Sequence, residues 1–152
     1  MDFDALQSKA VNMGETNDCS VKAWAVVTGD DYDTSHYVVE ELAKRPRRGG
    51  PQWRAYLEAF RAMGYRLTLV EYASKTVVTL GREFATRRDA QYLVATGGGG
   101  HVLGIRDGRV VDWTEGRRHR IAAVWRVEYV GVDAAGFEVP EQWRYWNQFR
   151  GM

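Results

Sequence analysis

The sequence has a single cysteine, three prolines and no long apolar run in its 152 residues. One cysteine excludes an internal disulfide and is typical of a reducing compartment. The longest apolar stretches, such as AWAVV, are far shorter than the roughly 20 residues that cross a bilayer. The opening segment MDFDALQSKA is acidic and lacks the apolar centre of a signal peptide. We therefore expect a soluble, cytoplasmic protein without a membrane partner.

Neither acidic nor basic residues are in clear excess, because the formal net charge is only +1. It is unevenly spread: residues 1–43 carry −7 and the rest of the chain carries +8. Two basic clusters, KRPRRGG (residues 44–50) and RRHR (residues 117–120), could face a nucleic acid or the acidic half of the same protein. The near-zero total favours the second interpretation, so we do not expect nucleic acid to be the main partner.

The composition is that of a globular protein, with 45% hydrophobic and 12% aromatic residues. At this length we expect one domain over residues 1–152 with a substantial core. In its first half, apolar spacing and capping residues predict three helices, at about residues 19–28, 34–44 and 51–63. The first, with Asn17 or Asp18 as cap and Gly29 as stop, has almost no polar face and should be buried. The inward-facing residues expected in the other two are Tyr37, Val38, Leu42, Trp53, Tyr56, Leu57, Phe60 and Met63.

The second half changes to the period of strands. YRLTLVEY, QYLVAT and VWRVEYV are typical of strands, and SKTVVTLGREFA favours a short helix capped by Ser74 or Thr76. HVLGIRDGRVVDW contains Asp107-Gly108 between two β-rich runs, the strongest short hairpin signal. We therefore predict an α+β fold in which amino-terminal helices, one of them buried and central, pack on an antiparallel sheet.

The hairpin predicts a pair of side chains. If Asp107 and Gly108 form the turn, His101 and Asp112 lie on one face as diagonal neighbours, their Cα atoms ~7–8 Å apart. An imidazole and a carboxylate can bridge that distance. Trp113 would then point to the opposite face, where core packing is expected.

Cys19 stands where the first helix begins. The partial positive charge at a helix amino terminus and a nearby imidazolium both favour a thiolate. A carboxylate on the far ring nitrogen would hold the histidine in place. Cys19, His101 and Asp112 are therefore a candidate triad for covalent acyl transfer. The alternatives are a small buried cysteine, a histidine that only begins a strand, and an exposed strand aspartate.

This order of residues resembles the papain-like cysteine peptidase superfamily. The segment NDCSVKAWAVVTGDDYDTSHYVVEELAKRPRRGG is similar to the amino-terminal half of small single-domain papain-like proteins of bacteria and bacteriophages. Ovarian-tumour deubiquitinases are partly similar at Asn17, Asp18, Lys22 and Ala23. Papain-like enzymes commonly have an oxyanion-binding Gln six residues before the cysteine, where this chain has Met13. Asn17, Asn12 and Gln7 are the candidate replacements, and the position of Asn17 beside the helix start favours it.

The resemblance implies a cysteine peptidase, or a related amide or thioester hydrolase, that acts on a peptide or protein. Cys19 would attack the carbonyl, His101 would carry the proton, Asp112 would orient His101, and Asn17 would bind the oxyanion. Two alternatives are a papain-fold binding module without activity and an acyltransferase with the same triad. We expect no cofactor, and one Cys with three scattered His gives no metal-ligand spacing. The remaining histidines, His36 and His119, are expected at the surface.

Two further segments carry expectations. The glycine tract before His101, in TGGGGH, does not match the spacing of a phosphate-binding loop, and we interpret it as a loop that lets substrate backbone approach the histidine. The aromatic and basic segment PEQWRYWNQFRGM is expected to pack onto the domain, with a partner-binding patch as the alternative.

Overall fold

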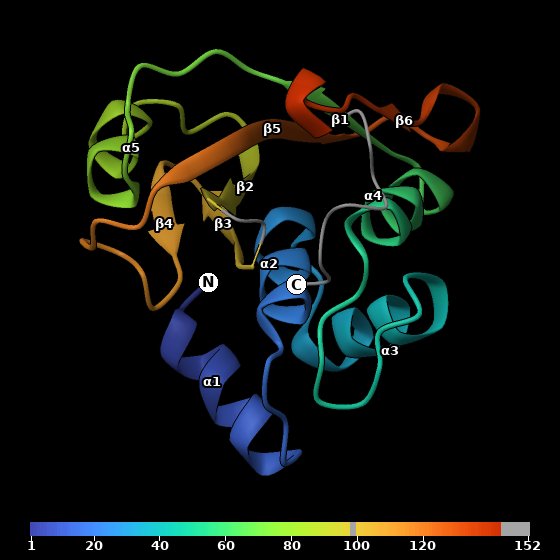
Figure 1. Cartoon of the computed structure of the whole chain (residues 1–152). Coiled ribbons are helices and arrows are strands. Elements are labelled where there is room, and N and C mark those ends of the chain that lie inside the picture. The colour runs from blue at the N-terminus through green and yellow to red at the C-terminus, as the bar shows by residue number, and fades with distance from the viewer. Residues whose placement is uncertain (98–99, 144–152) are drawn as a thin grey trace.

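The computed structural model describes residues 1–97 and 100–143 of the chain. Its helices are α1 (Phe3–Asn12), α2 (Cys19–Thr28), α3 (Tyr32–Leu42), α4 (Trp53–Ala62) and α5 (Val77–Glu83). Its strands are β1 (Tyr65–Leu69), β2 (Gln91–Thr96), β3 (Val102–Arg106), β4 (Arg109–Val111), β5 (Ile121–Tyr129) and β6 (Gly136–Phe137). Two 3₁₀ turns, Val132–Ala134 and Glu141–Trp143, follow β5. The α+β class predicted from the sequence is confirmed (Figure 1).

One six-stranded sheet runs in the order β4-β3-β2-β5-β1-β6. All neighbouring strands are antiparallel except β6, which pairs with β1 in parallel. The sheet is therefore mixed, and the expectation of a wholly antiparallel sheet is wrong at this edge. With two residues, β6 is too short for a period-two pattern to reveal it.

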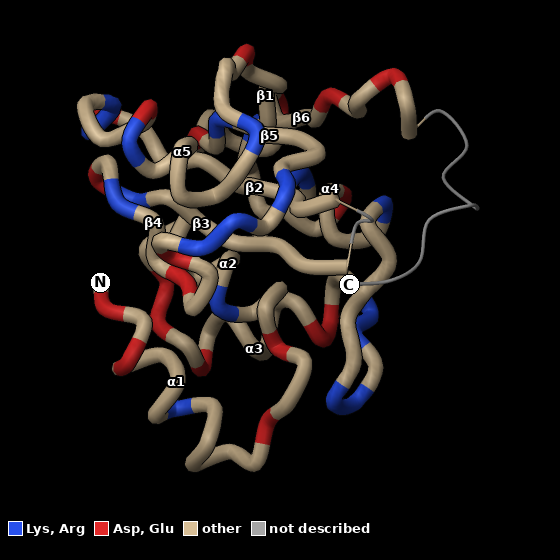
Figure 2. Tube along the Cα trace, turned by 60° about the vertical axis from the view of Figure 1, so that its left-hand side comes forward, with Lys and Arg blue, Asp and Glu red and all other residues tan. Residues whose placement is uncertain are grey.

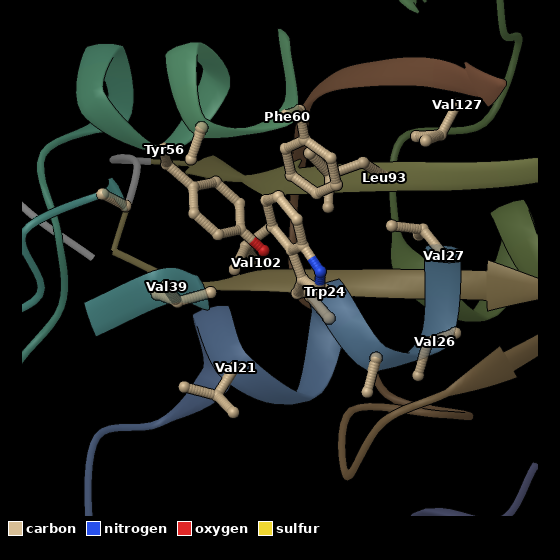
Figure 3. Close-up of a cluster of buried hydrophobic side chains, with 14 of the residues drawn as sticks. Val21, Trp24, Val26, Val27, Val39, Tyr56, Phe60, Leu93, Val102 and Val127 are labelled. Atoms are coloured by element: carbon tan, nitrogen blue, oxygen red, sulfur yellow. The ribbon is translucent and has the colours of Figure 1, made fainter. Parts of the chain in front are cut away.

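Helix α2 is buried at the centre of the molecule, as predicted (Figure 1). Every side chain from Ser20 to Val27 is buried, and Gly29, with φ of 83°, ends the helix in the left-handed conformation. Figure 3 shows Trp24 of α2 against Phe60 of α4, and their ring centroids lie 3.9 Å apart. The helix also packs directly on β3, because a Cβ at Gly104 would lie 2.6 Å from Val26 Cγ1. At the other end of the helix, the start of α2 lies near the start of β3, since Cys19 and His101 line one pocket.

Helices α3 and α4 differ from the prediction at their ends. Asp31 caps α3 by accepting from the Thr34 N–H at 2.7 Å, so this helix begins earlier than predicted. Its buried residues are Tyr32, Ser35, Val38 and Val39. The expectation of inward-facing Tyr37, Leu42 and Met63 is wrong, since all three are exposed. The other four predicted residues of α4, Trp53, Tyr56, Leu57 and Phe60, are buried as expected.

A fourth helix in the first half, α1, was not predicted. Asp2 caps it by accepting from the Asp4 N–H at 3.0 Å. Only Leu6 and Ala10 are buried, so its apolar stripe is too narrow to stand out in the sequence.

The hairpin has the predicted register. Ile105 pairs with Val110 and Arg106 with Arg109 across the turn. Asp107 and Gly108 have φ of 53° and 77°, as a two-residue type I′ turn requires. A side chain at Gly108 would also meet the Ala85 carbonyl oxygen at 2.4 Å, so glycine is needed here twice over.

Both faces of the sheet are covered. The larger core lies between the sheet and α2, α3 and α4. The smaller one is built by Val77, Leu80 and Phe84 around α5, on the side of the sheet away from α2. Thr76 begins α5 with a capping box that includes Thr79, which confirms the predicted short helix.

The carboxyl-terminal segment reaches the larger core. The ring of Trp143 lies 5.0 Å from that of Trp53 and 5.6 Å from that of Trp125, centroid to centroid. The predicted packing is thus found at Trp143, and residues 144–152 lie outside the described part of the chain.

Charges separate in space as they do in the sequence. Figure 2 shows acidic positions along α1 and basic positions along the segments around β4 and β5. From the first basic cluster, buried Arg45 turns inward and pairs with Glu15 at 2.6 Å, which agrees with the acidic half as its partner. Across the described residues, no helix combines the length and hydropathy that crossing a membrane requires.

Candidate active site

Cys19 is the first residue of α2 and is half-buried. The residue before it, Asp18, occupies the cap position without capping the helix. The first intrahelical donors are the N–H groups of Val21 and Lys22, which both bond the Asp18 carbonyl. The N–H groups of Cys19 and Ser20 precede them, so they belong to the unpaired amino end of the helix. The thiol therefore sits where backbone donors and the helix dipole favour negative charge.

His101 and Asp112 lie at the open end of the β3–β4 hairpin, opposite its turn. His101 Nε2 is 2.7 Å from Asp112 Oδ2, and the carboxylate is buried. The pairing predicted from the hairpin register is confirmed.

Thr114 completes this arrangement and was not predicted. Its hydroxyl donates to Asp112 Oδ2 at 2.5 Å, and its backbone N–H lies 3.2 Å from the same oxygen. Thr114 is fully buried. The signal in the sequence is the Asp-x-Thr spacing, since aspartate side chains often accept from the backbone two residues on.

His101 and Cys19 line the same pocket, and the thiol is close enough to affect the pKa of the ring. Burial alone would lower the pKa of His101, but hydrogen bonds to Asp112 and Cys19, together with their negative charges, raise that pKa to about 9. The imidazole is therefore protonated at neutral pH. Because Asp112 engages Nε2, the nitrogen left for the Cys19 sulfur is Nδ1.

Cys19, His101 and Asp112 line one pocket with a volume of about 260 Å³. Its lining residues are Asn17, Asp18, Cys19, Lys22, Gly100, His101, Asp112 and Trp113. Of the glycine tract, Gly100 thus borders the pocket, whereas Gly98 and Gly99 lie outside the described residues.

Trp113 corrects an expectation. It is 48% exposed and lies at the pocket, with its ring centroid 5.4 Å from that of His101. The predicted core position assumed that strand alternation continues past Asp112. Strand β4 ends at Val111, so the alternation stops before Trp113. Trp113 also meets His119 edge-on, with centroids 5.1 Å apart.

The candidate oxyanion residue, Asn17, is exposed beside Cys19 and has φ of 52°. Its side-chain nitrogen donates to the Arg48 carbonyl at 3.0 Å. That bond uses one of two amide hydrogens and leaves the other for the pocket. Asn12, Gln7 and exposed Met13 are not among the residues that line this pocket.

A second cluster joins Glu15, His36 and Glu40. Their ligand atoms lie within 4.8 Å of one another, the spacing of a possible metal site. However, the buried Arg45 guanidinium lies 2.6 Å from Glu15 and 3.4 Å from Glu40, so it already supplies the positive charge. Burial alone would raise the pKa of Glu15, but the hydrogen bonds and charges of Arg45 and His36 lower that pKa overall. His36, expected at the surface, is half-buried between the two carboxylates. We interpret the cluster as an ion-pair network that fixes the segment before α2.

We compared the chain with models of protein families, with curated proteins and with solved structures. No family model matches it, and neither does any curated protein or solved structure.

Proposed function

We propose that the protein is a papain-like cysteine hydrolase, a peptidase or a related amide or thioester hydrolase, that works through a covalent acyl-enzyme. The observation that carries the proposal is the contact of the His101–Asp112 pair with Cys19 at the start of a buried helix. A cysteine that only fills space needs neither the helix start nor a protonated imidazole beside it.

The chemistry follows from these contacts. The Cys19 thiolate attacks the substrate carbonyl carbon, and the electron pair of the C=O bond moves onto oxygen. The tetrahedral intermediate collapses to a thioester, and the leaving amine takes a proton from His101. Water then gives a proton to His101 as it attacks the thioester, which releases the acid and restores the Cys19 thiolate beside the protonated imidazole. Asp112, held by Thr114, keeps the ring oriented through both steps.

The oxyanion would be bound by the Cys19 backbone N–H and by the free amide hydrogen of Asn17. Backbone donors at a helix start are fixed before the reaction, so they stabilise the charge without reorganisation. The bond from Asn17 to the Arg48 carbonyl supports this role, because it limits the movement of the amide.

A groove beside the pocket supports a peptide or protein as the substrate. It has a volume of about 830 Å³ and runs between the first four residues and strand β4 with the segment that follows it. Asp112 and Trp113 line both the groove and the pocket, so the two cavities adjoin at the candidate nucleophile's partners. An extended chain could lie in the groove with its carbonyl at Cys19.

The test uses p-nitrophenyl acetate, a small activated ester that needs no knowledge of the natural substrate. We expect a burst of p-nitrophenol and an acetyl group on Cys19, detected by intact-mass and peptide mass spectrometry. Cys19→Ala should abolish both, and His101→Ala should reduce the burst rate. A wild-type protein that forms no acetyl-Cys19 would contradict the proposal and favour an inactive binding module.

The same experiment separates hydrolysis from acyl transfer. Adding a primary amine such as glycinamide during turnover should leave the product mainly acetate if water is the natural acceptor. A strong preference for the amide product would instead indicate an acyltransferase with the same triad.

A further inference from the structure

Lys22 is a buried lysine at the candidate active site. It is 8% exposed, and it lines the pocket together with Cys19 and His101. Lysine is almost never buried unless its charge is paired, because removing an ammonium from water is costly. Its position one helical turn after the candidate nucleophile therefore calls for an explanation.

A network of contacts neutralises and holds the ammonium. Lys22 Nζ lies 3.0 Å from Asp18 Oδ1 and donates to Gln7 Oε1 of α1. The Phe3 ring covers it, with the centroid 5.2 Å away. The other oxygen of Asp18 accepts from the Tyr32 hydroxyl at 2.7 Å, so the carboxylate is fixed as well.

Helix geometry directs this side chain toward the nucleophile. Side chains on an α-helix lean toward its amino terminus, and residues three or four apart share a face. Lys22 reaches back to Asp18, the residue directly before Cys19. An ammonium carries three N–H donors. Among the described residues, its hydrogen-bond partners are Asp18 and Gln7, so one N–H of this pocket-lining residue is left for a ligand.

We propose that Lys22 is a further catalytic residue, which donates its third N–H to the oxyanion that forms when Cys19 attacks an acyl group. The inference rests on the proposed covalent mechanism and assigns an oxyanion donor besides Asn17. As the Cys19 sulfur bonds to the carbonyl carbon, the C=O electron pair becomes a full negative charge on oxygen. A held ammonium stabilises that oxygen more than it stabilises the uncharged carbonyl, so it lowers the barrier.

The salt bridge with Asp18 has a defined part in this model. It holds the ammonium of Lys22 in place, so the third N–H needs no reorganisation when the oxyanion forms. If the Lys22–Asp18 ion pair were only structural, its removal would change the stability of the fold but not the rate of the acylation step.

The experiment compares two reactions of the same thiol. Acylation by p-nitrophenyl acetate passes through an oxyanion, whereas alkylation by iodoacetamide does not. The main variant is Asp18→Asn with Lys22→Met, which removes both charges and leaves no unpaired buried ion. A second variant, Asp18→Asn with Lys22→Gln, provides another route if the first one does not fold. Lys9→Met removes an exposed lysine of α1 and serves as the control.

We expect acylation by the double variants to slow by about 10²–10³-fold, the usual loss for one oxyanion donor, while alkylation changes less than about threefold. Lys9→Met should match wild type in both reactions. Equal acylation rates in wild type and variant would overturn the role of Lys22 but would leave the proposed function standing. A parallel loss in both reactions would also overturn it, because Lys22 would then act on the thiolate. Absence of Cys19 acylation in wild type would remove the proposed function and this inference together.

Discussion

The His101 imidazole and the Asp112 carboxylate lie 2.7 Å apart, although neither residue belongs to a strand of the hairpin that brings them together. His101 directly precedes β3 and Asp112 directly follows β4, so both lie at the open end of the hairpin, where regular pairing stops. The type I′ turn at Asp107-Gly108 fixes the register and thereby the pair. The site thus depends on a turn at the far end of the hairpin.

Reactivity of Cys19 is the first prediction. In the folded protein, iodoacetamide should alkylate Cys19 faster than in the unfolded protein, because an adjacent imidazolium and the helix start stabilise negative charge on the sulfur. His101→Ala should slow the reaction at pH 7 by at least about tenfold, because the imidazolium beside the sulfur is lost. The rates are measured by mass spectrometry, with urea-unfolded protein as the reference. Equal rates in folded and unfolded protein would contradict the prediction.

Stability should depend on pH through His101. Its pKa is raised to about 9 in the folded state, against about 6.5 when unfolded. The stabilisation is therefore fully present below pH 6.5 and is lost as the pH rises through 9. Urea unfolding of wild type and His101→Ala should show the largest difference in unfolding free energy near pH 6 and a smaller one near pH 9.5. A difference that stays constant over this range would show that the ring gains no proton affinity on folding.

Thr114 should act by holding Asp112. Thr114→Val keeps the shape but removes the hydroxyl, and it leaves a buried carboxylate oxygen without its 2.5 Å donor. We expect a loss of about 1–3 kcal/mol in unfolding free energy. Thr114→Ser, which keeps the hydroxyl, should lose much less. A loss in Thr114→Ser as large as that in Thr114→Val would contradict the prediction, because the effect would then not be specific to the hydroxyl.

The core around α2 offers a test of the fold. Phe60 is fully buried and stacks on Trp24, so Phe60→Ala should lower the unfolding free energy by about 3–5 kcal/mol. Met63→Ala, at the exposed end of the same helix, should change it by less than about 0.5 kcal/mol. Chemical denaturation of the two variants decides the matter, and a loss below about 1 kcal/mol for Phe60→Ala would be inconsistent with a packed core.

The sequence predicted those parts of the site that local rules determine. The buried helix at Cys19 followed from its apolar residues and caps, and the His101–Asp112 pair followed from a two-residue turn and the period of a strand. The orientation of Trp113 was predicted wrongly, because the same alternation was extended beyond the end of β4. In the sequence, Lys22 was notable only for a family resemblance. Its burial could not be predicted, because it depends on contacts with Asp18, Gln7 and Phe3 that form only in the folded chain.

The last prediction concerns the triad as a unit. If His101 needs Asp112 for its orientation, the two substitutions should be strongly non-additive in their effect on acylation. His101→Ala should slow p-nitrophenol release by about 10²–10⁴-fold, the usual contribution of a general acid-base group. Asp112→Asn should be less damaging, because an amide oxygen can still accept from the ring. Once His101 is removed, Asp112 has no ring to orient, so the double variant should be nearly as active as His101→Ala alone. Asn17→Ala should slow acylation while leaving iodoacetamide alkylation intact, since an oxyanion donor acts only on the transition state. Effects of His101 and Asp112 that simply multiply would mean that they act independently, and the observed 2.7 Å contact would then serve the structure of the hairpin alone.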